Sequence, residues 1–461
     1  MPPEIRRKAE RAMDALEPDM SVEEVRGLLD VTEKGCVKNS IRNCLTVLQR
    51  DPLLKGAIAK NLLTERVDIV KDIGITRSGS CMTDTDMKYL LLYLEETYGL
   101  TNEKKAGHAV SIAAHENSYH PVQDYLNAQK WDGTERIRCC LHHFLGADTD
   151  DYTYEVFRLF LMGAVHRAFV PGSKFDLMLC LVGGQGAGKS SFFRFLAGND
   201  EWFSDDLRKI DDDNVYRKLQ GHWIIEMSEM LATANARSLE EIRAFLSRQK
   251  ESYKIPYETH PEDRPRKCVF GGTSNTADFL PLDRTGNRRF LPVMVHKERQ
   301  EAHVLADEQA TRAYIGQVWA EAMVLYRKDG HILRLSPDME EYLKTVQTAF
   351  MPEDTKAGMI IGYLERLWGD MVCSRQLYRE ALHKPFEDAR QWEIREINDI
   401  MNNSVTGWKP FSNPRSFGEY GRQRGWERET PATGRGNRDE NTDDGFEKVP
   451  EGMDVPFEKR P

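Results

Sequence analysis

Apolar residues in the middle of the chain come in short continuous runs, and each run ends in glycine or polar residues. Such runs lie at 177–182, at 223–225 and at 268–270, the last within a predicted strand over 267–270. A short run that is apolar on both faces is typical of a strand buried in a parallel sheet between helices. The pattern therefore predicts an α/β core over residues 173–350, with a helix at 191–197 after its first strand.

Helical spacing dominates the chain ahead of this core. Apolar residues recur at three- and four-residue intervals over 22–29, 37–48, 53–63 and 85–98, which predicts a helical N-terminal region over residues 1–105. A second helical segment, 106–172, leads into the core. It contains a helix opened by His120-Pro121, a turn at 131–133 and a long helix over 151–170. Neither segment contains a catalytic constellation.

Residues 356–428 show three further helical patterns and then an aromatic, glycine-bearing stretch. The helices are predicted at 359–368, at 374–382 with Ser374 as cap, and at 390–402. Three helices followed by a basic hairpin are typical of a winged helix-turn-helix, which contacts DNA through basic side chains such as Arg422 and Arg424. A winged helix that binds only protein is the alternative. Residues 429–461 have few apolar anchors and predict a disordered tail.

The composition limits the class of protein and its partners. Charged residues make up 30% of the chain, and no apolar run approaches the ~20 residues that cross a membrane, so no membrane contact is expected. Eight scattered cysteines without a C-x-x-C pair favour a reducing cytoplasm over disulfides or a zinc site. Because the net charge is −10, nucleic-acid contacts are expected only at local basic patches.

The first predicted strand runs directly into a phosphate-binding pattern. Residues 183–190 read Gly-Gly-Gln-Gly-Ala-Gly-Lys-Ser, which fits G-x-x-x-x-G-K-[ST]. Glycines let backbone N–H groups wrap a triphosphate, and the following helix presents its positive N-terminus. We expect Lys189 to reach the phosphates of ATP and Ser190 to hold Mg²⁺. A glycine-rich turn that matches by chance is the alternative. The expected nucleotide contacts are Gly183, Gly184, Gln185, Gly186, Ala187, Gly188, Lys189, Ser190 and Ser191.

Polar residues at the ends of the next strands supply the other parts of an ATPase. Glu226 follows the second apolar run, Glu229 comes three residues later, and Asn275 follows the third. In open parallel sheets ligands bind beyond the carboxyl ends of the strands. We expect Glu226 and Glu229 to handle the metal and the attacking water, and Asn275 to bond the γ-phosphate or that water. A solvated helix start and a turn-forming asparagine are the alternatives.

Two basic stretches add further candidates. Arg288 and Arg289 precede another predicted strand. We expect them to stabilise charge on a transferring phosphoryl group, a role for which arginine is suited. The alternative is that both arginines form surface salt bridges. Between the second and third strands, cations alternate with aromatic residues, as on a surface that tracks single-stranded DNA. Acidic residues in the same stretch leave a solvated loop as the alternative. The candidate DNA contacts there are Lys250, Lys254, His260 and Arg264.

In this order the motifs resemble those of the virulence-associated protein E-like family of phages and mobile elements, whose ATPase is akin to superfamily 3 and poxvirus-type primase-helicases. The resemblance spans about residues 85–428. It rests on Asn117 with His120-Pro121, Trp131-Asp132-Gly133, Pro171-Gly172, the phosphate loop, 223–226 with Glu229, Pro256-Tyr257, Pro265-Arg266, 273–275 and 285–290.

The resemblance implies a P-loop ATPase of AAA+ type that assembles into a homo-oligomeric ring, such as a hexamer, in the cytoplasm of a bacterial host. It implies that Glu226 is the metal-associated acid, Asn275 the sensor, and Arg288 or Arg289 the finger that reaches a neighbour's ATP. It also implies that 248–267 contains the pore hairpin that grips single-stranded DNA.

Three features depart from the family pattern. Arg243 stands where the family suggests lysine, and Lys254 stands where it suggests arginine. Both exchanges keep the charge and change the hydrogen-bonding geometry. No acidic metal triad precedes the phosphate loop, so we expect no N-terminal primase domain.

The sequence thus predicts a DNA-dependent ATPase, a ring-forming superfamily 3-like helicase that replicates a phage or mobile element. Single-stranded DNA would pass through the pore, and duplex DNA would contact the winged helix. One alternative is an ATP-driven regulatory switch or DNA-binding adaptor without unwinding activity. Another is a non-enzymatic DNA-binding or scaffold protein with a degenerate nucleotide fold.

Overall fold

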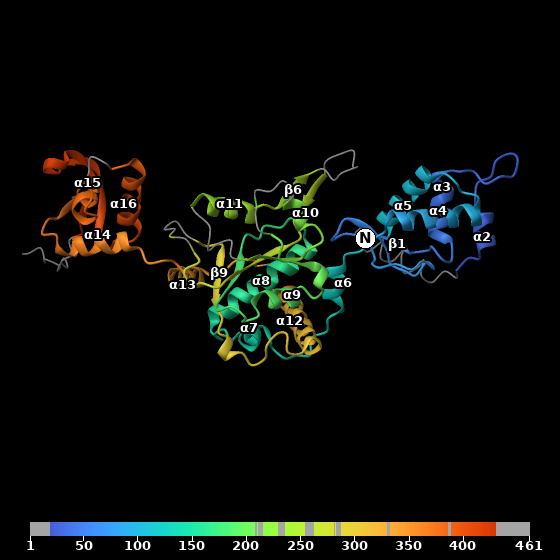
Figure 1. Cartoon of the computed structure of the whole chain (residues 1–461), viewed down its shortest axis with the longest axis horizontal. Coiled ribbons are helices and arrows are strands. Elements are labelled where there is room, and N and C mark those ends of the chain that lie inside the picture. The colour runs from blue at the N-terminus through green and yellow to red at the C-terminus, as the bar shows by residue number, and fades with distance from the viewer. Residues whose placement is uncertain are drawn as a thin grey trace, which may run out of the picture. The chain divides into compact units, whose positions relative to one another are not determined.

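The computed structural model of the chain forms two compact units, Met1–Pro352 and Glu353–Pro461 (Figure 1). It describes residues 19–207, 210, 215–228, 236–253, 262–280, 282, 287–329, 332–385 and 389–429. Within these residues, no helix is both long enough and apolar enough to cross a membrane.

A five-stranded parallel sheet forms the centre of the first unit, in the order β4-β5-β8-β3-β9. Val182 at the end of β3 aligns with Ser274 of β8 on one side and with Met294 of β9 on the other. The carboxyl ends of these strands therefore meet at one edge of the sheet, and the predicted α/β fold with a parallel sheet is confirmed. The strands are β3 Met178–Val182, β4 Phe203–Ser204, β5 Ile224–Ser228, β8 Val269–Ser274 and β9 Phe290–Met294.

Helices cover both faces of this sheet (Figure 1). Along β3, Leu179 and Leu181 join the core cluster formed with α8, α9 and α12, whereas Met178, Cys180 and Val182 join the cluster formed with α10 and α11. The alternation follows from the two-residue period of a strand. The helices of this part are α6 Pro121–Ala128, α7 Ile137–Leu145, α8 Asp151–Phe169, α9 Lys189–Leu196, α10 Val215–Leu219, α11 Ala236–Leu246, α12 Glu308–Asp329 and α13 Pro337–Thr348.

The residues that precede α6 enclose a separate hydrophobic core. It is built from α2 Val22–Gly27, α3 Ile41–Arg50, α4 Asp84–Tyr98 and α5 Glu103–Glu116, together with the antiparallel pair β1 Ile58–Asn61 and β2 Arg66–Ile69.

The predicted helix over 53–63 is wrong, because this segment is a turn followed by β1. The Asp51 carboxylate accepts hydrogen bonds from the backbone N–H groups of Leu53 and Leu54, at 2.8 and 3.0 Å. Gly56 then adopts a φ of 66°, a left-handed conformation that interrupts a helix. The N-terminal region is therefore mixed rather than wholly helical. The predicted helix over 37–48 begins only at Ile41, after its cap Ser40.

The second unit contains helices and a three-stranded antiparallel sheet in the order β10-β12-β11. The elements are α14 Thr355–Arg366, β10 Met371–Cys373, α15 Ser374–Gln376, the π-helical turn η3 Leu377–Ala381, α16 Gln391–Asn403, β11 Trp408–Ser416 and β12 Arg422–Arg428. Strand β10 was not predicted. Ser374 is the first residue of its helix and not the cap, because the extended backbone of a cap residue lies at Cys373, with φ −128° and ψ 163°. The Ser374 hydroxyl instead donates to Asn398 Oδ1. Residues 430–461 of the predicted tail lie outside the described residues.

Candidate nucleotide-binding site

The glycine-rich loop joins β3 to α9 in a conformation that glycine permits. Gly186 and Gly188 adopt φ angles of 78° and 79°, and Gly188 caps the start of α9. A Cβ atom at Gly183 would lie 2.4 Å from the carbonyl oxygen of Val295, so this position has no room for a side chain. The loop therefore turns tightly at the carboxyl edge of the sheet and presents the N-terminus of α9.

Lys189 is the first residue of α9, directly after this loop, and its side chain contacts Asn275. Its buried ammonium group donates to the carbonyl oxygens of Gly183 and Gly184, at 2.6 and 2.9 Å, and to Asn275 Oδ1 at 3.0 Å. Asn275 follows β8, which pairs directly with β3. The strand pairing thus brings together two predicted site residues that are far apart in the sequence.

Ser190 and Glu226 form the second half of the site. The Ser190 hydroxyl donates to Glu226 Oε1 at 2.7 Å, and the Thr273 hydroxyl donates to the same oxygen at 2.5 Å. Glu226 is placed by β5, where it aligns with Gly271 of β8. It lies in the middle of that strand, and not at its end as its position after the apolar run indicated.

The Glu226 carboxyl group is fully buried, and burial raises its pKa, while the hydrogen bonds from Thr273 and Ser190 oppose that shift. Its second oxygen, Oε2, is buried without a hydrogen-bond partner. Carboxylate and hydroxyl oxygens are the ligands that Mg²⁺ takes in proteins, often through water. Glu226 Oε2 therefore has the chemistry to contact a magnesium ion or one of its water ligands, and the Ser190 hydroxyl lies beside the same carboxylate.

A cavity of about 440 Å³ opens beside these residues, within the size range of small-ligand pockets. Its wall also contains His303 and Leu305, which follow β9 and which no motif in the sequence marks. The residues that line the cavity are Gln185, Gly186, Ala187, Gly188, Lys189, Ser190, Ser191, Ser228, Thr273, Ser274, Asn275, His303 and Leu305. Glu229 lies outside the described residues.

Arg288 and Arg289 lie at the opposite edge of the sheet. They precede Phe290, which aligns with Met178 at the start of β3, whereas the glycine-rich loop follows the end of β3. A strand of this length separates the two edges by roughly 13 Å. Arg289 Nε donates to Asp176 Oδ2 at 3.1 Å and to Ser247 Oγ at 3.2 Å. Arg288 is 3.8 Å from Asp176 and 71% exposed. Neither arginine is brought to the loop of its own chain.

The stretch between β5 and β8 forms an antiparallel hairpin, β6 Lys250–Tyr253 and β7 Glu262–Pro265. Lys250 pairs with Asp263 at 2.5 Å, and Arg264 aligns with Glu251 across the hairpin. Lys254 and His260 lie outside the described residues. The hairpin was predicted as a basic surface, but in its described part the charge of Lys250 is balanced by an acidic neighbour.

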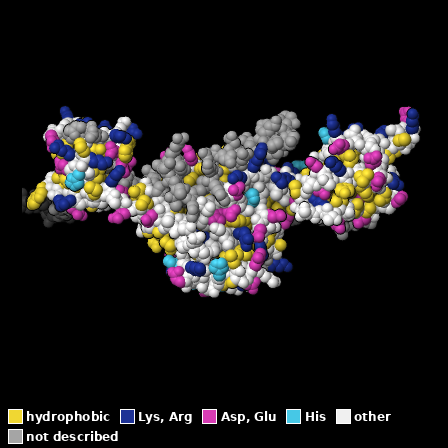
Figure 2. All heavy atoms as spheres, in the orientation of Figure 1, with side chains coloured by type: hydrophobic (Ala, Val, Ile, Leu, Met, Phe, Trp, Pro, Cys, Tyr) yellow, Lys and Arg dark blue, Asp and Glu magenta, His cyan; other side chains and the backbone are white. Residues whose placement is uncertain are grey.

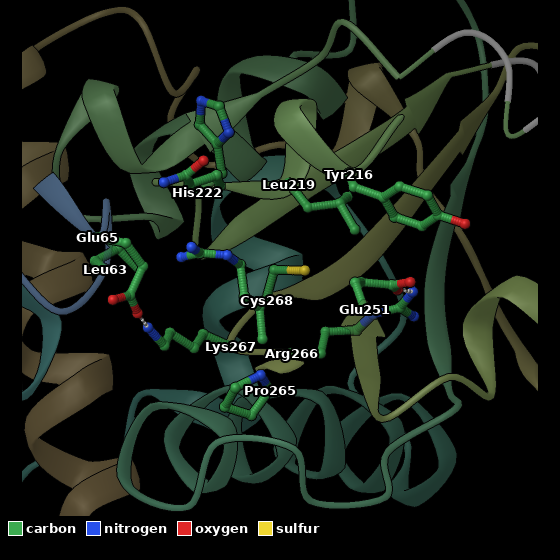
Figure 3. Close-up of a pocket in the computed structure, with 12 residues that line it drawn as sticks. Leu63, Glu65, Tyr216, Leu219, His222, Glu251, Pro265, Arg266, Lys267 and Cys268 are labelled. Atoms are coloured by element: carbon green, nitrogen blue, oxygen red, sulfur yellow. Dashed lines mark hydrogen bonds and ion pairs between the residues drawn. The ribbon is translucent and has the colours of Figure 1, made fainter. Parts of the chain in front are cut away.

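A small pocket lies at the base of this hairpin (Figure 3). Arg266 is buried there and forms an ion pair with Glu251, and Lys267 forms an ion pair with Glu65 of the N-terminal region. Arg266 immediately precedes the approach to β8, the strand that leads to Asn275. The chain therefore runs from hairpin strand β7 through residues 266–268 into β8, which ends beside the glycine-rich loop.

Basic residues on the rest of the surface are mixed with acidic ones. Figure 2 shows Lys and Arg side chains interspersed with Asp and Glu over the face drawn. Arg422 and Arg424 are both exposed and lie two residues apart on one face of β12, where Arg422 Nε donates to the Pro414 carbonyl oxygen at 3.1 Å.

Arg243 stands at a position where the family pattern suggests lysine. Its side chain donates to Asn287 Oδ1 at 2.8 Å.

Residues 126–352 match the family model described as the virulence-associated protein E-like domain. No curated protein matches the chain. Among solved structures, the apo structure of the NrS-1 C terminal region (305-718) is 12% identical, with 80% of this chain and 95% of that chain covered and a TM-score of 0.46. The A form apo structure of the same region is 13% identical, with 85% and 100% covered and a TM-score of 0.48.

Proposed function

We propose that the chain, whose residues 126–352 match the virulence-associated protein E-like domain, is a DNA-dependent ATPase of AAA+ type. It would act as a ring-forming, superfamily 3-like replicative helicase of a phage or mobile element, in the cytoplasm of a bacterial host. The observation that carries the proposal is the convergence of Lys189 with Asn275 and of Ser190 with Glu226 at one edge of the sheet.

The residues at this edge of the sheet would have different roles in phosphoryl transfer. The loop N–H groups and Lys189 would bind the triphosphate of ATP, which competes with the carbonyl oxygens for the lysine ammonium group. Ser190 and Glu226 would hold Mg²⁺, which supplies charge neutralisation at the phosphates when bound. Asn275 would orient the γ-phosphate or the attacking water, and Glu226 with Glu229 would accept the proton of that water.

Arg288 and Arg289 would complete the site of a neighbouring subunit. Their distance from the loop of their own chain and the exposure of Arg288 support an action in trans. Hydrolysis would then require assembly into a homo-oligomer, because only a neighbour can supply the positive charge to the transferring phosphoryl group.

DNA would contact two basic elements. The β6–β7 hairpin would grip single-stranded DNA, with Lys250, Lys254, His260 and Arg264 as candidates. The second unit, with its helices and the β11–β12 hairpin, would act as a winged helix on duplex DNA, and the exposure of Arg422 and Arg424 supports this role.

Hydrolysis by the purified chain tests the proposal directly. The ATPase rate per subunit should rise with protein concentration and rise again with single-stranded DNA, and Lys189→Ala should weaken Mg-ATP binding at least about tenfold, because charge-assisted hydrogen bonds are lost. Lys344→Ala, which removes an exposed lysine in α13, should change neither quantity. A rate that is independent of concentration and of DNA, or full ATP binding by the Lys189 variant, would argue against the motor.

Mixing two inactive variants tests the action in trans. Arg288→Ala should lower hydrolysis about 100-fold, as the loss of one transition-state donor does, and Lys189→Ala should be inactive because its own site lacks the lysine that contacts the phosphates. Mixed in equal amounts, the two variants should regain activity, since the Lys189 variant still donates an intact Arg288 to its neighbour. A mixture no more active than its components contradicts a shared site.

An ATP-driven switch without unwinding activity is the second candidate function. It is favoured by the Lys250–Asp263 ion pair, which leaves the described part of the hairpin with less positive charge for a DNA strand. Nucleotide binding and oligomerisation without any strand displacement would distinguish this function from that of a helicase.

A further inference from the structure

The segment after β9, residues 295–305, folds back over the glycine-rich loop. Gln300 Nε2 donates to the carbonyl oxygen of Ala187 at 2.8 Å. A Cβ atom at Gly188 would lie 3.0 Å from Val304 Cγ1, and the Val295 carbonyl oxygen closes over Gly183. The segment thus holds the loop at three successive points and forms one wall of the cavity beside Lys189.

Lys297 brings a second ammonium group to the loop. Its Nζ lies 3.7 Å from the place that a Cβ atom of Gly186 would occupy. The side chains on either side are engaged elsewhere, since Glu298 contacts His296 and Arg299 forms an ion pair with Asp148. Within the described part of the chain, the Lys297 side chain has no hydrogen-bond or ion-pair partner, so its charge is available to an anion on the loop.

His303 presents a hydrogen-bond donor to the same cavity. Its Nδ1 accepts a hydrogen bond from the Leu305 backbone N–H at 3.2 Å, so the neutral ring carries its proton on Nε2. Nε2 lies 3.5 Å from the Cβ position of Gly188, at the start of α9. Leu305 lines the cavity beside it and is 51% exposed, which offers an apolar surface to a nucleoside.

We propose that this segment completes the nucleotide site of its own subunit, with Lys297 as a second phosphate-binding lysine and His303 as a donor to a sugar or phosphate oxygen. The inference rests on the proposed function and names the residues that recognise a nucleoside triphosphate there. Lys297 and Lys189 approach the loop from different segments, so a polyphosphate lying along the loop contacts both. Neither residue is marked by the P-loop motif.

Competition binding with two probes tests the role of Lys297. A fluorescent ATP analogue is displaced by ATP or by inorganic tripolyphosphate, which lacks a base and a sugar. Lys297→Gln should weaken both competitors about tenfold, and Lys297→Arg should restore most of the affinity, because a charge-assisted contact depends on the cation. Lys328→Gln removes an exposed lysine at the far end of α12 and should leave both affinities unchanged.

His303→Ala should weaken ATP binding several-fold while the thermal unfolding midpoint stays unchanged. A loss for ATP alone assigns the donor to the sugar, and a loss for both competitors assigns it to the phosphates. If the wild-type chain binds no ATP, or if Lys189→Ala binds it equally well, the proposed function itself fails. If Lys189→Ala loses ATP but Lys297→Gln and His303→Ala bind it like the wild-type chain, this inference alone is overturned.

Discussion

Glu226→Gln is expected to lower ATP hydrolysis by about 100- to 1000-fold, the effect of losing a preorganised charged group at a phosphoryl-transfer site. ATP binding should change little, because the amide oxygen of glutamine can accept the same hydrogen bonds from Ser190 and Thr273. Single-turnover hydrolysis and equilibrium binding measure the two effects separately. Glu240→Gln, an exposed exchange in α11, is the matched control and should have wild-type activity.

The same variant should be more stable than the wild-type protein at neutral pH. Burial raises the pKa of Glu226 above its ordinary value of 4.5, so the folded state binds this proton more tightly than the unfolded state does. The carboxyl group therefore favours folding at low pH, and that contribution is lost as the pH rises through the folded pKa. Glutamine does not ionise, which removes the desolvation cost of the charge.

We expect Glu226→Gln to raise Tm by roughly 2–4 °C at pH 7.5. We expect the difference to shrink as the pH falls through the raised pKa of Glu226 in the folded state, because the wild-type carboxyl group then becomes uncharged as well. Thermal unfolding across this pH range measures the effect. A lower Tm at pH 7.5 would mean that the buried carboxylate stabilises the fold, and unchanged hydrolysis would remove Glu226 from the mechanism.

Arg266→Ala is expected to destabilise the first unit by about 3–5 kcal/mol, the usual result of breaking a buried ion pair from one side. The side chains of Arg266 and Glu251 are only 1% and 7% exposed. Arg266 Nη1 also donates to the carbonyl oxygen of Phe245 at 2.6 Å, and its guanidinium group lies over the rings of Phe245 and Phe270. Alanine would leave a buried carboxylate and a carbonyl oxygen without this donor.

Urea unfolding measures the loss, and two further variants show its origin. Replacing both partners by apolar residues, Arg266→Met with Glu251→Leu, should recover most of the stability, because no unpaired charge stays buried. Lys250→Ala breaks the exposed ion pair with Asp263 in the same hairpin and should change the free energy of unfolding by less than about 1 kcal/mol. A loss below about 1 kcal/mol for Arg266→Ala would contradict the account.

The N-terminal region shows where sequence patterns are least informative. Residues 53–63 are apolar at intervals that suit a helix, yet they form a turn and β1. Two local interactions override the spacing: the Asp51 carboxylate accepts from the backbone after it, and the Asn61 side chain accepts from Leu63 N–H at 2.9 Å. The spacing of apolar residues indicates which residues are buried. It does not indicate whether side chains supply the hydrogen bonds of a turn.

By itself, the sequence determined the strand, the glycine-rich loop and the helix with Lys189 and Ser190, because that conformation depends on contiguous residues and on glycine torsions. Only the tertiary structure decided which other side chains lie beside Lys189 and Ser190. The pairing of β3 with β8 put Asn275 beside Lys189, the return of residues 295–305 brought Lys297 and His303 to the loop, and the start of β9 kept Arg288 away. Strand order follows from the burial of side chains contributed by distant segments, which no local pattern of residues contains.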